Sequence, residues 1–178
     1  MSTLNEDINK CTKCTFSQEE YNMPNKAKGT GPLVGYYQKE FKNKIMIVGM
    51  NPSHRRFPGI WQAFGGEVRH AGSGQVFIDL LKDLGYLDKV YITNLVKCST
   101  PTNKITEHDV NMCKEFLWRE IELVNPPFIV CLGSDVFQKM RDIVDDELRY
   151  LRHPSYYSNY HGKERDDYIK EICKTLQK

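Results

Sequence analysis

The stretch Val90-Tyr91-Ile92-Thr93-Asn94-Leu95-Val96 is a run of mostly apolar, β-favouring residues with two polar residues toward its end. A continuous run of this length predicts a strand that is buried on both faces. Three more segments are interpreted as strands: Ile45 to Val48, Phe128 to Leu132 and Leu148 to Leu151. Strands that are buried on both faces are typical of parallel sheets covered by helices.

Helical patterns separate these strands. An apolar face from Val76 to Leu84 ends at Gly85, and Thr106 begins a second helix that the prolines after Asn125 end. A third helix begins at Ser134, and a fourth runs from about Lys163 to Leu176. Strands that alternate with helices predict an α/β protein, a three-layer αβα sandwich with a mostly parallel four-stranded central sheet.

Length and composition restrict the class of protein. The 178 residues are expected to form a single domain over residues 1–178, and the formal net charge of +2 does not by itself indicate a nucleic-acid-binding protein. No apolar run is long enough to cross a bilayer, and Met1 to Asp7 has neither the basic start nor the apolar core of a signal peptide. We therefore expect a cytoplasmic protein that does not bind membranes and keeps its thiols reduced.

Packing explains only two of the six cysteines. Cys131 lies inside an apolar strand and Cys173 on the apolar face of the last helix, where a thiol behaves as a small hydrophobe. The other four are Cys11, Cys14, Cys98 and Cys113. Four thiolates suit either tetrahedral zinc or an iron–sulfur cluster, and their spacing does not choose between the two. Residues 1–40, which show no clear strand or helix pattern, would form the segment that binds the metal.

Polar residues follow three of the predicted strands. Gly49-Met50-Asn51-Pro52-Ser53 follows the first strand, Thr93-Asn94 lies toward the end of the second, and His153-Pro154-Ser155 follows the fourth. Each has an ordinary structural explanation when taken alone, such as the turn that asparagine forms before proline. In an open α/β sheet, however, ligands bind beyond the carboxyl ends of the strands. Two amides and an imidazole are therefore expected to converge on one crevice.

These segments resemble the uracil-DNA glycosylase superfamily. The residues that carry the resemblance to its iron–sulfur, family 4-like type are Tyr91 to Cys98, Cys113, Ile121 to Pro126, Leu132-Gly133 and the closing His153-Pro154-Ser155. The CxxC pair near the N-terminus completes the cysteine set of that family. The resemblance implies a [4Fe–4S] cluster on Cys11, Cys14, Cys98 and Cys113.

The first motif is similar to a different member of the superfamily. Iron–sulfur members usually carry an acidic residue directly after the motif glycine, where this chain has Met50. Gly49-Met50-Asn51-Pro52 instead resembles the single-strand-selective monofunctional uracil-DNA glycosylases, and Phe64 to Val68 resembles their stacking segment. The chain thus combines the cluster of one family with the active-site loop of another, which argues against an acidic general base.

The resemblance implies a monofunctional DNA glycosylase that hydrolyses the N-glycosidic bond of uracil or a related modified pyrimidine in DNA, as in base excision repair. The implied catalytic residues are Asn51, which orients water, and His153, which stabilises charge at O2 of the base. The implied substrate-binding residues are Gly49, Met50, Phe64 and Asn94. The implied contacts to DNA phosphates are Ser53, Arg55, Lys97 and Ser155. The partner is DNA, as a single strand or as a base flipped from a duplex, and a monomer is expected because excision requires no assembly.

Two alternatives stay open. A protein of the same fold could bind a modified base in DNA without excising it, because the first motif lacks an acid. A zinc-stapled domain of unrelated function would also explain the four thiols.

Overall fold

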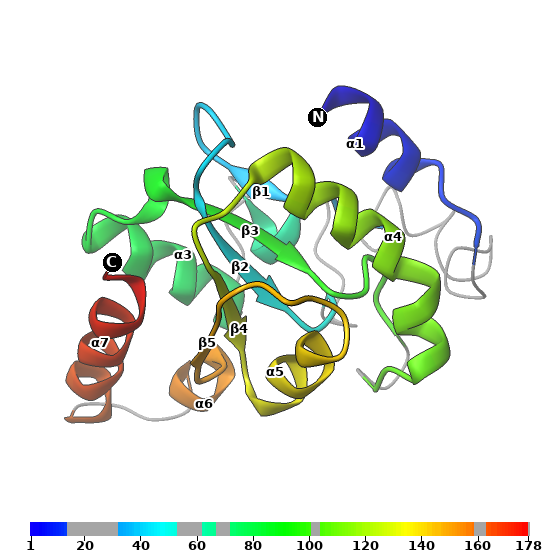
Figure 1. The fold of residues 1–178 in the computed structure, drawn as a ribbon. Coiled ribbons are helices and arrows are strands. Elements are labelled where there is room, and N and C mark those ends of the chain that lie inside the picture. Colours follow the sequence, from blue (N-terminus) through cyan, green and yellow to red (C-terminus); the bar gives the residue numbers. More distant parts are fainter. Residues whose placement is uncertain (14–31, 53–61, 67–71, 101–103, 159–162, 178) are drawn as a thin grey trace.

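A single mixed sheet forms the centre of the molecule. The computed structural model describes residues 1–13, 32–52, 62–66, 72–100, 104–158 and 163–177. Within them, five strands lie in the order β1-β3-β2-β4-β5. Their bounds are β1 Tyr36–Tyr37, β2 Ile45–Gly49, β3 Val90–Asn94, β4 Ile129–Leu132 and β5 Leu148–Leu151. The strands β3, β2, β4 and β5 are parallel to one another, whereas β1 pairs antiparallel with β3 (Figure 1).

The α/β class and the mostly parallel sheet are confirmed. The additional strand is β1, which extends the edge of the sheet beside β3 and is too short, at two residues, to leave a sequence pattern. Strand β3 ends at Asn94, because residues 95–98 form bends, so the predicted strand was two residues too long.

The helices α3, α4, α5 and α7 lie where the sequence patterns predict them, whereas α1 and α6 were not predicted. Their bounds are α1 Ser2–Asn9, α3 Ser73–Asp83, α4 Glu107–Val124, α5 Ser134–Arg141, α6 Pro154–Ser158 and α7 Lys163–Leu176, with short 3-10 turns η2 Ala63–Gly65 and η3 Leu87–Lys89. Helix α4 begins with a capping box, in which the Thr106 side chain accepts from the Asp109 N–H and the Asp109 carboxylate accepts from the Thr106 N–H. None of the helices in the described ranges is long and apolar enough to span a membrane.

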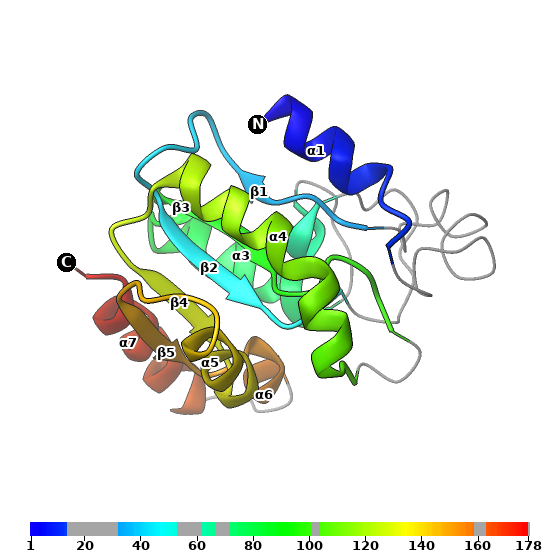
Figure 2. The same cartoon turned by 45° about the vertical axis from the view of Figure 1, so that its right-hand side comes forward.

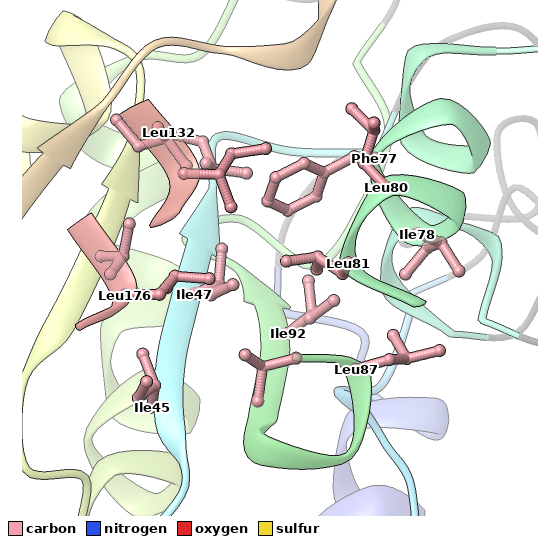
Figure 3. Close-up of a cluster of buried hydrophobic side chains, with 14 of the residues drawn as sticks. Ile45, Ile47, Phe77, Ile78, Leu80, Leu81, Leu87, Ile92, Leu132 and Leu176 are labelled. Carbon is pink, nitrogen blue, oxygen red and sulfur yellow. The ribbon is translucent and has the colours of Figure 1, made fainter. Parts of the chain in front are cut away.

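Two apolar clusters fill the space between sheet and helices. One joins Ile47 and Ile92 of the sheet to Phe77 and Leu81 of α3 and to α7 (Figure 3). The other joins Val48 to α4 and α5 on the opposite face (Figure 2). Successive side chains of a strand point to opposite faces, so each buried strand contributes to both clusters. The three-layer αβα arrangement is thereby confirmed.

Helix α1 adds to the outside of α4. Leu4 and Ile8 pack against Phe116 in a third cluster, and Arg119 pairs with Asp7 at 2.7 Å. Lys13 forms an ion pair with Glu115 and lies 4.9 Å from the centroid of the Phe116 ring. Helix α1 and Lys13 are therefore docked along α4 (Figure 2).

Candidate functional site

Three of the residues predicted to form the site, Gly49, Asn94 and His153, lie at one edge of the sheet. Because β2 to β5 are parallel, their carboxyl ends share that edge, with Gly49 paired to Asn94 and Leu132 paired to Leu151. His153 follows β5 by two residues. Two strands separate β3 from β5, so their axes are roughly 14 Å apart. Asn94 and His153 therefore lie at the same end of the sheet.

Asn94 and Phe64 meet over Gly49. A Cβ atom on Gly49 would lie 2.7 Å from Asn94 Oδ1 and 2.7 Å from Phe64 Cε2. Only a residue without a side chain therefore fits beneath this amide and ring. Asn94 is 2% exposed, and Phe64 is half-buried, with its ring 6.0 Å from that of Phe77. An amide beside an aromatic ring is a suitable surface for a planar base.

The backbone of Phe64 is strained. Its φ of 57° and ψ of 17° lie in the left-handed region, which costs about 1–2 kcal/mol for a residue with a Cβ atom. Its backbone is also held against α3, where a Cβ on Gly74 would lie 3.2 Å from Phe64 O. Strained residues persist where the surrounding structure fixes them and cluster at functional sites.

The Gly49→Ala substitution is expected to close this site. The added methyl group would push against both Phe64 and Asn94, and a displacement of about 1 Å can lower a rate by roughly 10²-fold. Overpacking should also cost about 1–3 kcal/mol of stability. Kinetics of the base excision that the sequence resemblance implies, together with the melting temperature, measure both effects. Affinity for DNA that already contains an abasic site should persist, whereas a wild-type excision rate would contradict this geometry.

His153 is held in one tautomer. Its Nδ1 accepts a hydrogen bond from the Ser155 backbone N–H at 3.1 Å, and Ser155 Oγ lies 2.8 Å away. A backbone N–H can only donate, so Nδ1 is unprotonated and Nε2 carries the proton of the neutral ring. Burial lowers the pKa of His153 below its ordinary value. The site thus offers a neutral Nε2–H donor near pH 7.

The lowered pKa of His153 sets an expected pH dependence. Because the neutral ring would be the donor, the excision that the sequence resemblance implies should stay constant down to pH of about 6.5 and decline only below it. The free energy of unfolding should fall over the same acidic range, because the folded protein binds this proton less readily than the unfolded chain. A pH–rate profile of wild type and of His153→Gln tests this: the acidic inflection should disappear in the variant. A decline that begins above pH 7 would contradict the assignment.

Helix α7 anchors the residue before His153. The Glu171 carboxylate accepts from the Arg152 backbone N–H at 3.0 Å and from its Nε at 2.6 Å. The Tyr168 hydroxyl donates to the Arg152 carbonyl at 2.9 Å. Both backbone groups of Arg152 are thereby fixed. Sequence analysis missed Glu171 and Tyr168, and their i, i+3 spacing on one helix face was the available signal.

Helix α3 connects the two halves of the site. It contacts η2, which carries Phe64, and also α6, which begins directly after His153. The turn that carries Phe64 and the helix that follows His153 thus both pack against α3. The side chains of Phe64 and His153 project from separate elements at the carboxyl edge of the sheet.

Asn51 follows β2 at the same edge. It is half-buried, and its Nδ2 lies 3.2 Å from Pro52 O and 3.5 Å from Thr100 Oγ1. Its loop is fixed by the Val96 N–H, which donates to Met50 O at 2.9 Å. The Met50 side chain packs against the apolar cluster on the α4 face, whereas Gly49 follows the alternation of Ile45 and Ile47 on the opposite face. The structure therefore does not bring Met50 together with Phe64 and Asn94.

The prediction of a phosphate contact for Lys97 is corrected by the structure. Lys97 is 1% exposed, and its ammonium donates to Thr93, to Asn94 and to Glu120. A lysine with three donors in use inside the protein has none to offer to DNA. Ser155 is exposed at the edge, and Ser53 and Arg55 lie outside the described residues.

Burial does not divide the cysteines as the sequence predicts, because Cys98 and Cys113 are buried like Cys131, whereas Cys173 is half-buried. Cys131 is fully buried in β4, and burial raises the pKa of its thiol to about 12, so it stays protonated. Cys98 and Cys113 are buried, Cys11 is half-buried, and Cys14 lies outside the described residues. Among the residues with assigned positions, no three His, Cys, Asp or Glu side chains form a group that could hold a metal ion. The structure therefore does not bring Cys11, Cys98 and Cys113 together as a group that could hold a metal ion.

A groove of about 740 Å³ lies away from these residues. Its lining includes Lys44 and Ile45 at the start of β2, Lys89 before β3 and Pro127 before β4. These positions mark the amino ends of the strands. The groove is therefore at the edge of the sheet opposite Asn94 and His153, and it is not the crevice that the sequence predicts.

The fold and its edge define an α/β protein that places amide, imidazole and aromatic side chains at the carboxyl ends of a mostly parallel sheet. The chain belongs to the Uracil DNA glycosylase superfamily, whose family model matches residues 35–177. The resemblance inferred from the sequence is confirmed at this level, while the roles of individual motif residues stay predictions.

Several relatives carry the name Type-4 uracil-DNA glycosylase. The protein of Sulfurisphaera tokodaii is 29% identical over 171 residues, which cover 92% of this chain and 70% of that protein. The protein of Archaeoglobus fulgidus is 30% identical over 144 residues, covering 80% and 64%. That of Thermotoga maritima is 31% identical over 136 residues, covering 75% and 62%. The matched regions thus span between 62% and 70% of these relatives.

Proposed function

We propose that this chain is a monofunctional DNA glycosylase that removes uracil or a related modified pyrimidine in base excision repair. The observation that carries the proposal is the convergence of Asn94 and Phe64 over Gly49, with His153 on the same edge of the sheet. Family membership supports the same activity. The DNA would present the base from a single strand or after flipping it from a duplex, because a stacked base cannot enter such a site.

Asn94 would read the base. Uracil presents a donor at N3–H and an acceptor at O4, and one asparagine amide supplies the matching acceptor and donor. Cytosine presents the reverse pattern, so an amide fixed in one orientation would leave buried polar groups unpaired. A site of this kind can discriminate by a factor of roughly 10⁴. Phe64 would cover one face of the ring.

His153 would stabilise the departing base. Breaking the bond between C1′ and N1 leaves its electron pair on the base and an oxocarbenium-like sugar, by analogy with glycoside hydrolysis. The Nε2–H of the neutral imidazole would donate to O2 as negative charge develops there. The hydrogen bond from Ser155 to Nδ1 supports this role, because it keeps the proton on Nε2.

Asn51 would orient the water whose oxygen bonds to C1′. This water loses one proton to solvent, and the departing base anion takes up one proton in turn, so that the sugar product and the neutral base result. A strong base is not required, since an oxocarbenium-like centre reacts with a weak nucleophile. The contacts of Asn51 to Pro52 and Thr100 hold its side-chain amide at the end of β2. Ser155, Ser53 and Arg55 stay predicted phosphate contacts, and the enzyme would act as a monomer.

Cys11, Cys14, Cys98 and Cys113 would hold a [4Fe–4S] cluster. Two observations support this: Cys98 and Cys113 are buried thiols, and the Lys13 contacts with Glu115 and Phe116 dock the N-terminal segment beside α4. When bound, the cluster would supply a structural link rather than redox chemistry. It would join residues 1–40 to the loop after β3 and to α4 in the single domain.

The Cys98→Ala variant is expected to lose the cluster. The wild type, purified without oxygen, should be brown, absorb broadly near about 400 nm and contain about four irons per chain. Cys173→Ala changes a half-buried thiol of α7 outside the proposed ligand set, so it should keep the iron and the colour. A colourless wild type that contains zinc would overturn the cluster.

A product assay tests the activity. The protein is incubated with oligonucleotides that contain uracil, 5-hydroxymethyluracil, thymine or cytosine, as single strands and as duplexes, and abasic sites are cleaved with alkali. We expect abasic sites at uracil or at a modified pyrimidine, with no strand cleavage before alkali. Saturable binding without abasic product across the panel would instead support a protein that recognises a modified base without excising it.

A further inference from the structure

We propose that the buried ion pair between Lys97 and Glu120 is a positioning device that fixes Asn94 for reading the base. This inference rests on the proposed base-reading role of Asn94. It replaces the phosphate contact that the sequence suggested for Lys97, and it gives Glu120, in the middle of α4, a role in a site that it does not touch.

The ammonium of Lys97 ties three groups together. Nζ donates to the Asn94 backbone carbonyl at 2.7 Å, to Thr93 Oγ1 at 2.8 Å and to Glu120 Oε2 at 2.6 Å. An ammonium has three N–H donors, and each has an acceptor here. Lys97 therefore folds back over the turn after β3 and holds the carbonyl of Asn94.

Glu120 anchors this arrangement to α4. The Glu120 side chain is 0% exposed, and its carboxylate accepts from the hydroxyl of Tyr91 at 3.0 Å and from that of Thr93 at 3.0 Å. Burial, followed by the charge of Glu120, raises the pKa of Tyr91, so its hydroxyl stays protonated and continues to donate. Helix α4 and strand β3 are thus joined through one polar network.

The network and the Asn94 side chain lie on opposite faces of the sheet. Tyr91 belongs to the apolar cluster on the α4 face, and Ile92 belongs to the cluster on the α3 face. Alternation along β3 then points Thr93 toward α4 and Asn94 toward α3 and Phe64. Lys97 and Glu120 therefore hold the backbone of Asn94 from the α4 face of the sheet and leave its side-chain amide facing the site.

Stability alone is a poor explanation for this pair. Removing two charges from water costs several kcal/mol per ion, and replacing a buried pair with neutral residues is often neutral or stabilising. Among the described residues, a second buried lysine is Lys44, 7% exposed at the amino edge, whose ammonium donates to the carbonyls of Gln38 and Asp88. Lys44 contacts no residue of the site, so it provides a matched control.

The double variant Lys97→Met/Glu120→Gln tests the proposal. It removes both charges together, keeps an acceptor for Tyr91 and Thr93, and removes the donor to Asn94. We expect a melting temperature close to that of the wild type, with kcat for uracil excision lowered about 10- to 100-fold and KM little changed. The preference for uracil over cytosine in oligonucleotide binding should fall together with kcat. Lys44→Met should change neither kcat nor the preference for uracil in binding.

Thr93→Val provides a second variant if the double variant does not fold. It keeps the shape of the side chain and both charges, and it removes the hydroxyl that contacts both Lys97 and Glu120. The kcat and the binding preference should therefore fall as in the double variant, but by a smaller factor. Unchanged kcat and unchanged binding preference in a folded variant would overturn the positioning role. If the wild type binds uracil selectively but does not excise it, the proposed activity fails while the binding preference still tests Lys97 and Glu120. If the wild type neither excises nor discriminates, both proposals fail.

Discussion

The His153→Ala variant is expected to excise uracil about 10²- to 10³-fold more slowly than the wild type, as measured by single-turnover kinetics. The reason is the loss of the Nε2–H donor. The contacts of Ser155 to Nδ1 keep the proton of the neutral ring on Nε2. The effect should appear in the chemical step, because charge at O2 develops only there. Affinity for uracil-containing DNA should change little.

Two variants serve as controls for this result. His108→Ala removes an exposed histidine of α4 and should keep the wild-type rate. Ser155→Ala removes the hydroxyl near Nδ1 but retains the backbone N–H, so its loss should be clearly smaller than that of His153→Ala. A His153→Ala enzyme within a few-fold of wild type would remove the imidazole from the proposed chemistry.

The Asn51→Ala variant is expected to lose roughly 10²-fold in excision rate, because the attacking water loses its orienting amide. Asn51→Asp retains the size and an acceptor oxygen, so it should keep more activity than the alanine variant. Folding should be intact in both, since the amide is half-buried and its contact to Thr100 is 3.5 Å long. Thermal melts and single-turnover rates separate the two effects.

Asn111→Ala is the matched control, since Asn111 is exposed on α4 and alanine favours a helix. If Asn51 only holds its loop through Thr100, then Thr100→Val should reproduce the full loss. A Thr100→Val variant as slow as Asn51→Ala would therefore contradict a direct role for the Asn51 amide.

The sequence predicts the elements whose patterns are local. The parallel strands and the helix that Thr106 caps are found where apolar runs, caps and prolines predict them. Strand β1 and helix α1 were missed, because a strand of two residues and a helix of eight residues depend on tertiary contacts. Short elements of this kind are stabilised by packing more than by propensity.

The site was predictable where it follows from strand topology. Asn94 and His153 share an edge because the strands that precede them are parallel. Lys97 was assigned wrongly, because a lysine just past a strand end is usually exposed and its burial depends on Glu120, 23 positions away. The anchoring of Arg152 by Glu171 was missed for the same reason: its partner is 19 positions distant. Contacts between distant elements cannot be predicted from a local sequence pattern.

A crystal structure of the protein with a uracil-containing oligonucleotide would test most directly whether one base occupies this edge. The structure should show uracil against Phe64, with N3–H and O4 on the Asn94 amide and O2 within hydrogen-bond distance of His153 Nε2. A uracil bound elsewhere, such as in the groove that Lys44 and Lys89 line at the amino ends of the strands, or one that contacts neither Asn94 nor His153, would contradict the proposed site.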